Sequence, residues 1–419
     1  MSMLRQKTVK EAGEYVCPYC FSTISLSQVH YECTTVSCPT VFAEQAVSTR
    51  NAAALKYVSK DGKHEIDPER SSFLNRNPHG DDAIIAKRHI IRGGEQVCNV
   101  CRRPVYLRVC PICHNPVPNG AEEEGNRIIV ILGPKGVGKS HFMAVLINQL
   151  QNLVSNEFNG SLSPANDATA FRYKDKFYNK LFVEKCKLPA TKSFGVSDDS
   201  REPLIYYLRL YGDNPRTYTL VFFDTAGEDL VTADRIRELN IHSFIAKSAG
   251  IIYLIDPLQT PYVNSRINID KKPNVGPDVT DVLNNIANVI RTNNRIRGRE
   301  KIGIPLAVAL TKSDVLFKSP ETEEEDKVLF GLNSSLRIPR EYGKFDMENF
   351  DQISVELEEY LRRILGQGFL NIVDGFAKHS YFAVSSLGCN PTGDKLPRGV
   401  SPMRVEDPLL WLLNQEDKR

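Results

Sequence analysis

Eight of the ten cysteines lie within the first 113 residues, in two groups of four. The first group is Cys17, Cys20, Cys33 and Cys38, and the second is Cys98, Cys101, Cys110 and Cys113. Each group begins with a C-x-x-C pair, whose sulfurs can reach one ion from a tight turn, and four thiolates complete a tetrahedral zinc site. We predict one zinc ion per group, with a zinc ribbon in residues 1–45, a linker or insert in 46–95 and a second ribbon in 96–118.

Disulfides are the alternative, but they are typical of small secreted domains, and the first 15 residues lack the apolar core of a signal peptide. His30 and His114 lie beside the cysteine groups; we interpret them as bystanders, although either could replace a thiolate. A closed four-thiolate site does no chemistry, so the ribbons would act through their surfaces. Basic and aromatic residues near the second group suit a protein contact or, alternatively, nucleic acid: Arg102, Arg103, Tyr106 and Arg108.

A glycine-rich segment indicates phosphate chemistry. Residues 133–140 read GPKGVGKS, which matches the phosphate-binding pattern G-x-x-x-x-G-K-[ST]. In such a loop the backbone N–H groups face the phosphates, the lysine reaches the β- and γ-phosphates, and the serine hydroxyl binds magnesium. The predicted nucleotide-binding residues of this segment are Gly133, Gly136, Gly138, Lys139, Ser140 and the following His141.

The elements around this loop predict the fold. An apolar strand over 127–132 precedes the loop, and an apolar helix over 142–153 follows it. Further strands are predicted at 204–209, 219–223, 250–255, 306–310 and 381–384, with helical patterns between the last four. Strands that alternate with helices favour a parallel sheet covered on both faces. We therefore predict a three-layer α/β P-loop NTPase domain over 126–413, with an amphipathic helix over 171–187. Residues 59–82 are polar and turn-rich and are expected to form a loop.

The predicted strand over 219–223 is followed directly by the sequence DTAGE, residues 224–228. The Asp224 carboxylate can hold magnesium directly or through water, and the Gly227 N–H can meet the γ-phosphate. Asp256, which ends another strand, is expected to support turn geometry rather than chemistry.

The strand over 306–310 ends in TKSD, residues 311–314, which predicts the base. Guanine offers two donors on one edge, its N1–H and its 2-amino group, and the Asp314 carboxylate can accept both. Adenine would present an acceptor there, so Asp314 disfavours an ATPase. The Lys312 stem can lie along the base, and Thr311 belongs to the same motif. The strand that ends at Val384 leads into Ser385, Ser386 and Leu387, whose backbone N–H groups can meet guanine O6.

The ordered set GPKGVGKS, DTAGE, TKSD and SSL resembles the signature motifs of translation-factor-type GTPases, the class that contains Ras-like and Arf-like proteins. The resemblance implies a Ras-like GTPase domain that binds GTP or GDP with Mg²⁺, in which Ser140, Asp224 and a switch threonine hold the magnesium. Together with the cysteine-rich segment, the chain resembles the double-GTPase proteins of bacterial conflict systems, which implies a role in antiviral defence.

Two features depart from Ras-like proteins. Ras-like proteins place a glutamine after DTAG, where this chain has Glu228, so the resemblance predicts slow hydrolysis without a partner. The switch threonine is not identified by pattern; Thr191 is our prediction, and Thr169 is the next candidate. The predicted catalytic residues are Lys139, Ser140, Thr191, Gly227 and Glu228.

Composition excludes several classes. The chain has 419 residues, is 41% hydrophobic and carries 53 basic against 51 acidic residues, a net charge of +2. Such a composition is globular, and the longest apolar runs are far shorter than the about 20 residues of a bilayer span. We expect a cytoplasmic protein with a protein partner or a second GTPase. The alternatives are a nucleic-acid-associated GTPase and a GTP-binding scaffold that does not hydrolyse.

Overall fold

The computed structural model describes most of the chain, and it divides into two compact units, 1–126 and 127–419. The described residues are 14–38, 65–117 without 75, 87 and 93–95, 126–191, 203–223 without 212–214, 230, 232, 241–318 without 268–272 and 274–277, 329–337 without 332 and 333, and 346–415. Each unit has its own core.

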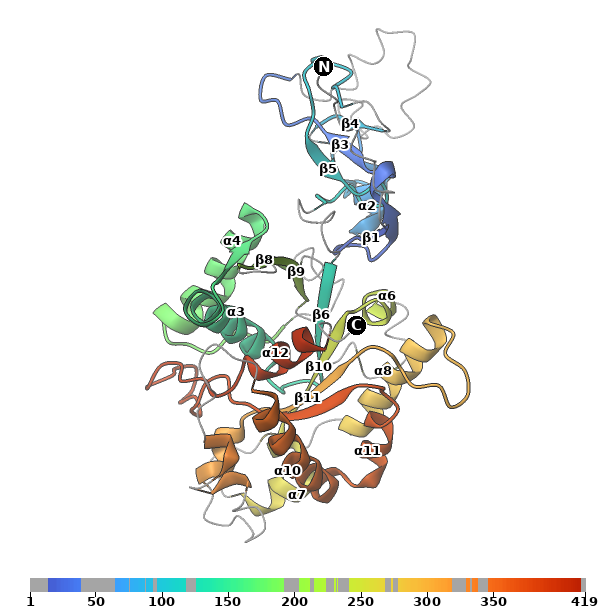
Figure 1. Cartoon of the computed structure of the whole chain (residues 1–419). Helices are drawn as coiled ribbons and strands as arrows, with labels where there is room; N and C mark the ends of the chain where they lie inside the picture. The colour runs from blue at the N-terminus through green and yellow to red at the C-terminus, as the bar shows by residue number, and fades with distance from the viewer. Residues whose placement is uncertain are drawn as a thin grey trace, which may run out of the picture. The chain divides into compact units, whose positions relative to one another are not determined.

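The described part of the first unit consists of short strands, a short α-helix and the 3-10 helix Leu26–Gln28 (Figure 1). Its elements are β1 (Glu14–Val16), β2 (Thr23–Ser25), β3 (His30–Glu32), α2 (Pro68–Phe73), β4 (Ile90–Ile91) and β5 (Leu107–Val109). β1 and β2 form an antiparallel hairpin, and β3 pairs with both β4 and β5 in a second small sheet. Helix α2 falls in the stretch expected to be a loop; Asp67 caps it by accepting a hydrogen bond from the Arg70 N–H at 2.9 Å, and Pro68 occupies its first turn.

The second unit is built on a seven-stranded sheet with the order β12-β11-β10-β6-β9-β8-β7. The strands are β6 (Asn126–Leu132), β7 (Gly160–Pro164), β8 (Leu204–Leu210), β9 (Arg216–Phe223), β10 (Gly250–Ile255), β11 (Leu306–Leu310) and β12 (His379–Ala383). β6, β10, β11 and β12 run parallel, whereas β7 and β8 pair antiparallel at the opposite edge. The expected strands are confirmed within a few residues, and β7 is an addition that the sequence did not indicate.

Helices cover both faces of this sheet, which confirms the three-layer α/β fold (Figure 1). They are α3 (Lys139–Glu157), α4 (Asp167–Tyr173), the π-helix Lys174–Val183, α6 (Ile241–Ala246), α7 (Pro261–Arg266), α8 (Val279–Asn293), α10 (Met347–Leu365), α11 (Gln367–Val373) and α12 (Asp407–Asn414). Buried side chains of α3 and α12 share one core cluster with alternate residues of β6 and β10, for example Ile252 and Leu254. The intervening Tyr253 points to the other face, where its hydroxyl donates to the Val279 carbonyl of α8 at 2.6 Å.

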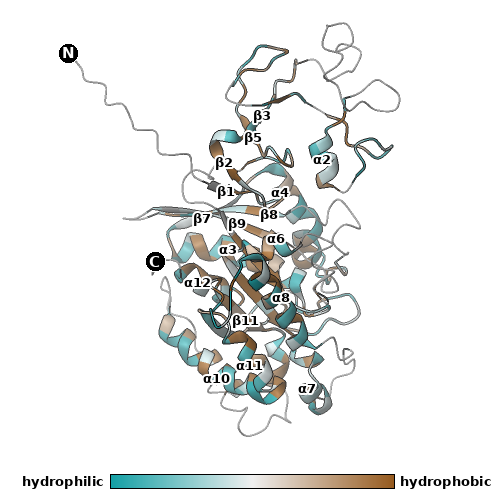
Figure 2. Cartoon of the chain, turned by 90° about the vertical axis from the view of Figure 1, so that its right-hand side faces the viewer, coloured by the Kyte–Doolittle hydropathy of each residue, from teal (hydrophilic) through white to brown (hydrophobic). Residues whose placement is uncertain are grey.

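Apolar residues gather on the strands, and hydrophilic residues lie along the covering helices such as α8 and α10 (Figure 2). Both helices bury one apolar stripe, as expected for amphipathic helices on a sheet. Within the described ranges, no helix is both long and apolar enough to cross a bilayer.

The strand order determines where a ligand binds. β6 lies between β10 and β9, and the chain passes first to the β9 side and then crosses to β10. In open α/β sheets the crevice at the carboxyl end of such a central strand is the usual binding site. The glycine-rich loop leaves β6 at this point.

Candidate nucleotide site and cysteine clusters

The glycine-rich loop passes so close to the neighbouring strand that only glycine fits at its start. Gly133 has a φ of 151°, and a Cβ at this position would lie 2.5 Å from the Leu254 carbonyl oxygen. Gly138 precedes α3 with a φ of 92°, in the left-handed region. The N–H groups at the start of the 19-residue α3 therefore open onto this loop, where the helix dipole favours an anion.

The Lys139 ammonium is folded over the loop. It donates to the carbonyl oxygens of Gly133 at 2.8 Å and Pro134 at 2.9 Å, although it is buried. These bonds hold the lysine beside the backbone that would wrap around a phosphate chain.

The base-recognition motif is tied to the same loop. The Thr311 hydroxyl lies 3.1 Å from the Val137 carbonyl and 3.0 Å from that of Ile255. Lys312 donates to the Gly136 carbonyl at 3.2 Å and to the buried Asp256 carboxylate at 2.6 Å. The motif at 311–314 is therefore tied to the glycine-rich loop by two side-chain contacts.

Asp256 serves two structural roles. One carboxylate oxygen accepts from the Leu258 N–H at 3.0 Å, which forms the turn after β10, and the other receives the Lys312 ammonium. The turn role was expected from the sequence; the ion pair with Lys312 was not, because the two residues are distant in the chain.

The Asp314 carboxylate is held in position by the next strand end. The Ser385 hydroxyl donates to Asp314 Oδ1 at 2.7 Å and accepts from the Gly388 N–H at 3.0 Å. Gly388 has a φ of 70°, and a Cβ there would lie 2.0 Å from the Ser401 carbonyl oxygen, so this loop requires glycine. The Ser385–Leu387 segment thus lies beside Asp314, a contact that the sequence analysis did not include; the meeting of its N–H groups with guanine O6 stays a prediction.

These segments enclose one pocket of about 710 Å³. Its lining includes Gly136, Gly138 and His141 of the loop but not Gly133, Lys139 or Ser140. It also includes Thr311, Lys312, Asp314 and residues 385–387, and it adds the unpredicted segment 389–393. A volume of 300–1,000 Å³ is typical of small-molecule sites. Nothing in the local sequence of 389–393 indicates a binding role, because its position depends on distant pairing.

That distant pairing joins 389–396 to the segment before the predicted switch threonine. Cys186 forms a backbone bridge with Lys395, and the Lys187 N–H donates to the Asp394 carbonyl at 2.8 Å. The Lys187 and Asp394 side chains also form an exposed ion pair at 2.9 Å. Lys187 lines the pocket, so this pairing brings a cation to it.

His141 joins α3 to the same segment. Its Nε2 accepts a hydrogen bond from the Leu188 N–H at 3.0 Å, which requires a neutral ring with the proton on Nδ1. Burial, together with the nearby cations of Lys312 and Lys187, lowers the pKa of His141 to about 4. His141 lines the pocket and its side chain also contacts the segment at Leu188; its predicted role in nucleotide binding stays a prediction.

Thr191 lies beside Ser140, the serine that the sequence predicts to bind magnesium. Its hydroxyl is 2.6 Å from the Ser140 hydroxyl, although the two residues are 51 positions apart. Thr169, the other candidate, lies in α4 and its hydroxyl accepts from the Ile205 N–H instead. Asp224, Gly227 and Glu228 lie outside the described residues.

The cysteines form two clusters, but their membership differs from the prediction. One cluster is Cys17, Cys20, Cys110 and Cys113, and the other is Cys33, Cys38, Cys98 and Cys101. Sulfur pairs within them lie 3.7–3.9 Å apart. Two thiolates on one tetrahedral zinc with Zn–S of about 2.3 Å are about 3.8 Å apart, so both clusters fit a metal ion and not disulfides.

The pairing of β3 with β5 explains the exchange. The strands are antiparallel, with His30 opposite Val109 and Glu32 opposite Leu107. The start of β3 therefore lies beside the end of β5, which leads into Cys110, while the end of β3 leads into Cys33 beside the start of β5. The two successive ribbons predicted from the sequence are wrong: both halves of the first unit contribute to both clusters.

The fold and the pocket define a P-loop protein of the GTP-binding type. Residues 127–368 match the model of the Double-GTPase 2 family, and the chain belongs to that family. This agrees with the resemblance that the sequence motifs indicated.

Among individual proteins, the chain is 29% identical over 322 residues to the putative ESX-1 scaffolding and assembly protein SaeC of Mycolicibacterium smegmatis, covering 73% of this chain and 79% of SaeC. Two solved structures are similar to it. The GTP-bound Ski7 GTPase-like domain of S. cerevisiae is 16% identical with a TM-score of 0.29, and the match covers 70% of this chain and 50% of the Ski7 chain. The signal recognition particle receptor SRb-GTP/SRX complex of Chaetomium thermophilum is 12% identical with a TM-score of 0.28, covering 64% and 94%.

Proposed function

We propose that this protein is a guanine-nucleotide switch that binds Mg–GTP, hydrolyses it slowly and transmits its state to a protein partner. The observation that carries this proposal is the position of Thr191 at Ser140, because the two hydroxyls that would share a magnesium ion are already adjacent at 2.6 Å. Release of such a threonine when the γ-phosphate is lost is how GTPase switches change shape.

The guanine preference rests on Asp314. Its contact with Ser385 leaves the carboxylate at the wall of the pocket, where it can accept the two donors of guanine. Competition between GTP and ATP for the wild-type chain tests this directly. Equal affinities would contradict the proposal, and Lys139→Ala should abolish the binding of either nucleotide.

Magnesium would be held by Ser140 and Thr191, with Asp224 as the third residue from the sequence motif. The ion would screen the phosphate charges and bridge the β- and γ-phosphate oxygens. Thr191→Ala should therefore lower the affinity for GTP in the presence of Mg²⁺ and have little effect with GDP. An equal loss for both nucleotides would show that Thr191 does not respond to the γ-phosphate.

Hydrolysis is proposed to be slow because Glu228 replaces the glutamine that orients water. A carboxylate beside the γ-phosphate is repelled unless it is protonated or turned away. The isolated chain should turn over at about 10⁻⁴ to 10⁻³ per second, as Ras does without its activator. Glu228→Gln should raise the rate if the carboxylate hinders water and lower it at least tenfold if Glu228 is the base. A wild-type rate of about 1 per second would refute a partner-dependent switch.

A scaffold that binds GTP without hydrolysing it is the second candidate function. It is favoured by the relative from M. smegmatis, whose name describes scaffolding and assembly and not defence. Single-turnover measurements with excess protein separate the two functions, since a scaffold would produce no GDP. The remaining alternative, nucleic-acid binding by the first unit, predicts an affinity that falls steeply with salt.

A further inference from the structure

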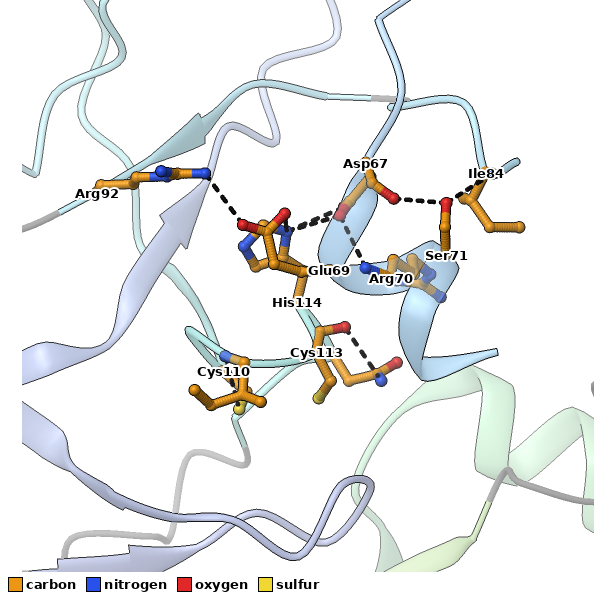
Figure 3. Close-up of polar contacts among 11 residues, drawn as sticks. Asp67, Glu69, Arg70, Ser71, Ile84, Arg92, Cys110, Cys113 and His114 are labelled. Carbon is orange, nitrogen blue, oxygen red and sulfur yellow. Dashed lines mark hydrogen bonds and ion pairs between the residues drawn. The ribbon is translucent and has the colours of Figure 1, made fainter. Parts of the chain in front are cut away.

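A third group of metal-ligating side chains lies in the first unit, outside the cysteine clusters (Figure 3). It consists of Asp67 and Glu69 at the start of α2 and His114 directly after Cys113. His114 Nδ1 lies 3.0 Å from both Asp67 carboxylate oxygens and 3.9 Å from Glu69 Oε2. Asp67 and His114 are buried, at 9% and 4% exposure.

Three buried polar atoms of this region have no hydrogen-bond partner among the described residues. They are Glu69 Oε2, His114 Nε2 and His30 Nδ1. Each such atom costs about 1–3 kcal/mol when it is buried unpaired, so three in one place indicate a missing group. Arg92 reaches only the other Glu69 oxygen, at 3.1 Å, and leaves Oε2 facing His114 (Figure 3).

We propose that His114 Nδ1, Asp67 and Glu69 bind a third divalent metal ion of the zinc, manganese or iron type. One imidazole and two carboxylates are ligands that such ions accept, and three protein ligands leave positions for water. The ion would supply the hydrogen-bond partner that Glu69 Oε2 lacks and would balance the charges of the buried Asp67 and the partly buried Glu69 carboxylates.

The same site accounts for the two orphan imidazole nitrogens. A metal on Nδ1 places the remaining proton of His114 on Nε2, which then needs an acceptor. His30 Nδ1 is a buried acceptor without a partner, and the two ring centres lie 5.7 Å apart. Two imidazoles joined by an N–H···N bond of about 2.9 Å have centres about 5 Å apart, so a small shift or one water connects them. Outer partners of this kind orient a metal-bound histidine.

The competing explanation is a charged His114 that pairs with Asp67 in the absence of metal. It predicts two ions per chain, because only the cysteine clusters would be filled. The third site predicts three ions, of which one has no sulfur ligand. Cobalt distinguishes them, since thiolate-bound Co²⁺ has an intense charge-transfer band that a site of nitrogen and oxygen ligands lacks.

The experiment titrates the metal-depleted, reduced full chain with Co²⁺ and separately measures metal content after reconstitution with Zn²⁺, Mn²⁺ or Fe²⁺. We expect the thiolate band to saturate at two equivalents and a third equivalent to bind without adding to it. Glu69→Gln should remove the third equivalent and leave the thiolate band intact. Glu32→Gln is the matched control, because Glu32 is a half-buried carboxylate of the same unit with its own arginine, Arg88, at 3.7 Å.

Two equivalents in the wild-type chain, with each of the metals tested, would overturn the proposal. So would identical metal content in the Glu69→Gln and Glu32→Gln variants. His30→Phe provides a second readout, with an expected 10- to 100-fold loss of affinity at the third site alone. If Glu69→Gln disturbs the fold and the thiolate band, the wild-type titration still decides between two ions and three.

Discussion

The two units of this protein are stabilised by different means. The second unit buries alternate residues of its seven-stranded sheet under long helices, so its core is continuous. The first unit has two small core clusters, and cysteines make up much of both, such as Cys17 and Cys110 in one and Cys33 and Cys98 in the other. A module this small buries little apolar surface, and a metal ion in each cysteine cluster would supply the missing free energy.

The two units also differ in how far apart in the chain the residues of each site lie. In the second unit, neighbouring parts of the site follow strand ends in chain order. In the first unit, each cluster joins residues 60–96 positions apart, such as Cys17 and Cys113 or Cys38 and Cys98. Loss of either metal therefore affects both ends of that unit at once.

The largest expected effect is on the first unit. Zinc can be removed by a chelator or by combining Cys17→Ser with Cys20→Ser. Either change should cost about 10–16 kcal/mol of stabilising binding free energy per site and unfold that region locally. Alkylation followed by mass spectrometry should show Cys110 and Cys113 as reactive in the double variant, because the structure places them in the same cluster. The predicted sequential ribbons would leave both protected. Nucleotide affinity should stay within about twofold of wild type, since the pocket residues belong to the second unit.

The next effect is on the base preference of the second unit. Asp314→Asn should lower GTP affinity by at least about 100-fold, because two hydrogen bonds to a charged group, each of about 1.5–3 kcal/mol, are lost. Xanthine nucleotide should gain affinity, because its 2-oxo group needs a donor. Competition binding of GTP and XTP measures both. Asp256→Asn is the contrasting variant: it should weaken the two nucleotides alike, since Asp256 contacts Lys312 and not the base motif's carboxylate.

A smaller effect concerns acid stability. The pKa of His141 is about 4 in the folded protein and about 6.5 when unfolded. The unfolded chain then binds more protons between these values, so stability is complete above about pH 6.5 and falls as the pH drops towards 4. The loss at pH 4.5 is about 2–3 kcal/mol.

Trp411, the single tryptophan, is buried in α12 and reports unfolding of the second unit alone. Denaturant unfolding followed by its fluorescence at pH 7 and pH 4.5 measures this loss. His141→Gln should reduce the difference between the two pH values. An unchanged difference would show that other groups cause the acid sensitivity.

The smallest expected effect is at the exposed pair of Lys187 and Asp394. Their side chains are 45% and 80% exposed, so Asp394→Asn should change the free energy of unfolding by less than about 0.5 kcal/mol. The same Trp411 measurement applies. A loss above about 1 kcal/mol would mean that the ion pair, and not the backbone bonds of Lys187 and Leu396, holds the two segments together.

The motifs of the predicted nucleotide site could be recognised from the sequence alone because each of them is local. A glycine-rich loop, a TKSD turn and an SSL turn each follow directly from a strand, and parallel strands bring their carboxyl ends to one edge of the sheet. The gathering of these motifs at one edge of the sheet could therefore be predicted without coordinates, whereas the contact between Asp314 and Ser385 and the bonds from Lys139 to the loop carbonyls came only from the structure. Thr191 was chosen because it lies between the loop and β8; the structure places its hydroxyl beside that of Ser140, and its role as the switch threonine stays a prediction.

Only the tertiary structure decided which cysteines share an ion, where 389–393 lies and what surrounds His114. A C-x-x-C pair provides two of the four ligands of a tetrahedral site. Any other pair of cysteines could provide the remaining two, so the sequence does not specify the partner. The antiparallel register of β3 and β5 selects the partner, and that register depends on side-chain packing between segments about 75 residues apart. The buried atoms of His30, Glu69 and His114 likewise meet only after those strands have paired.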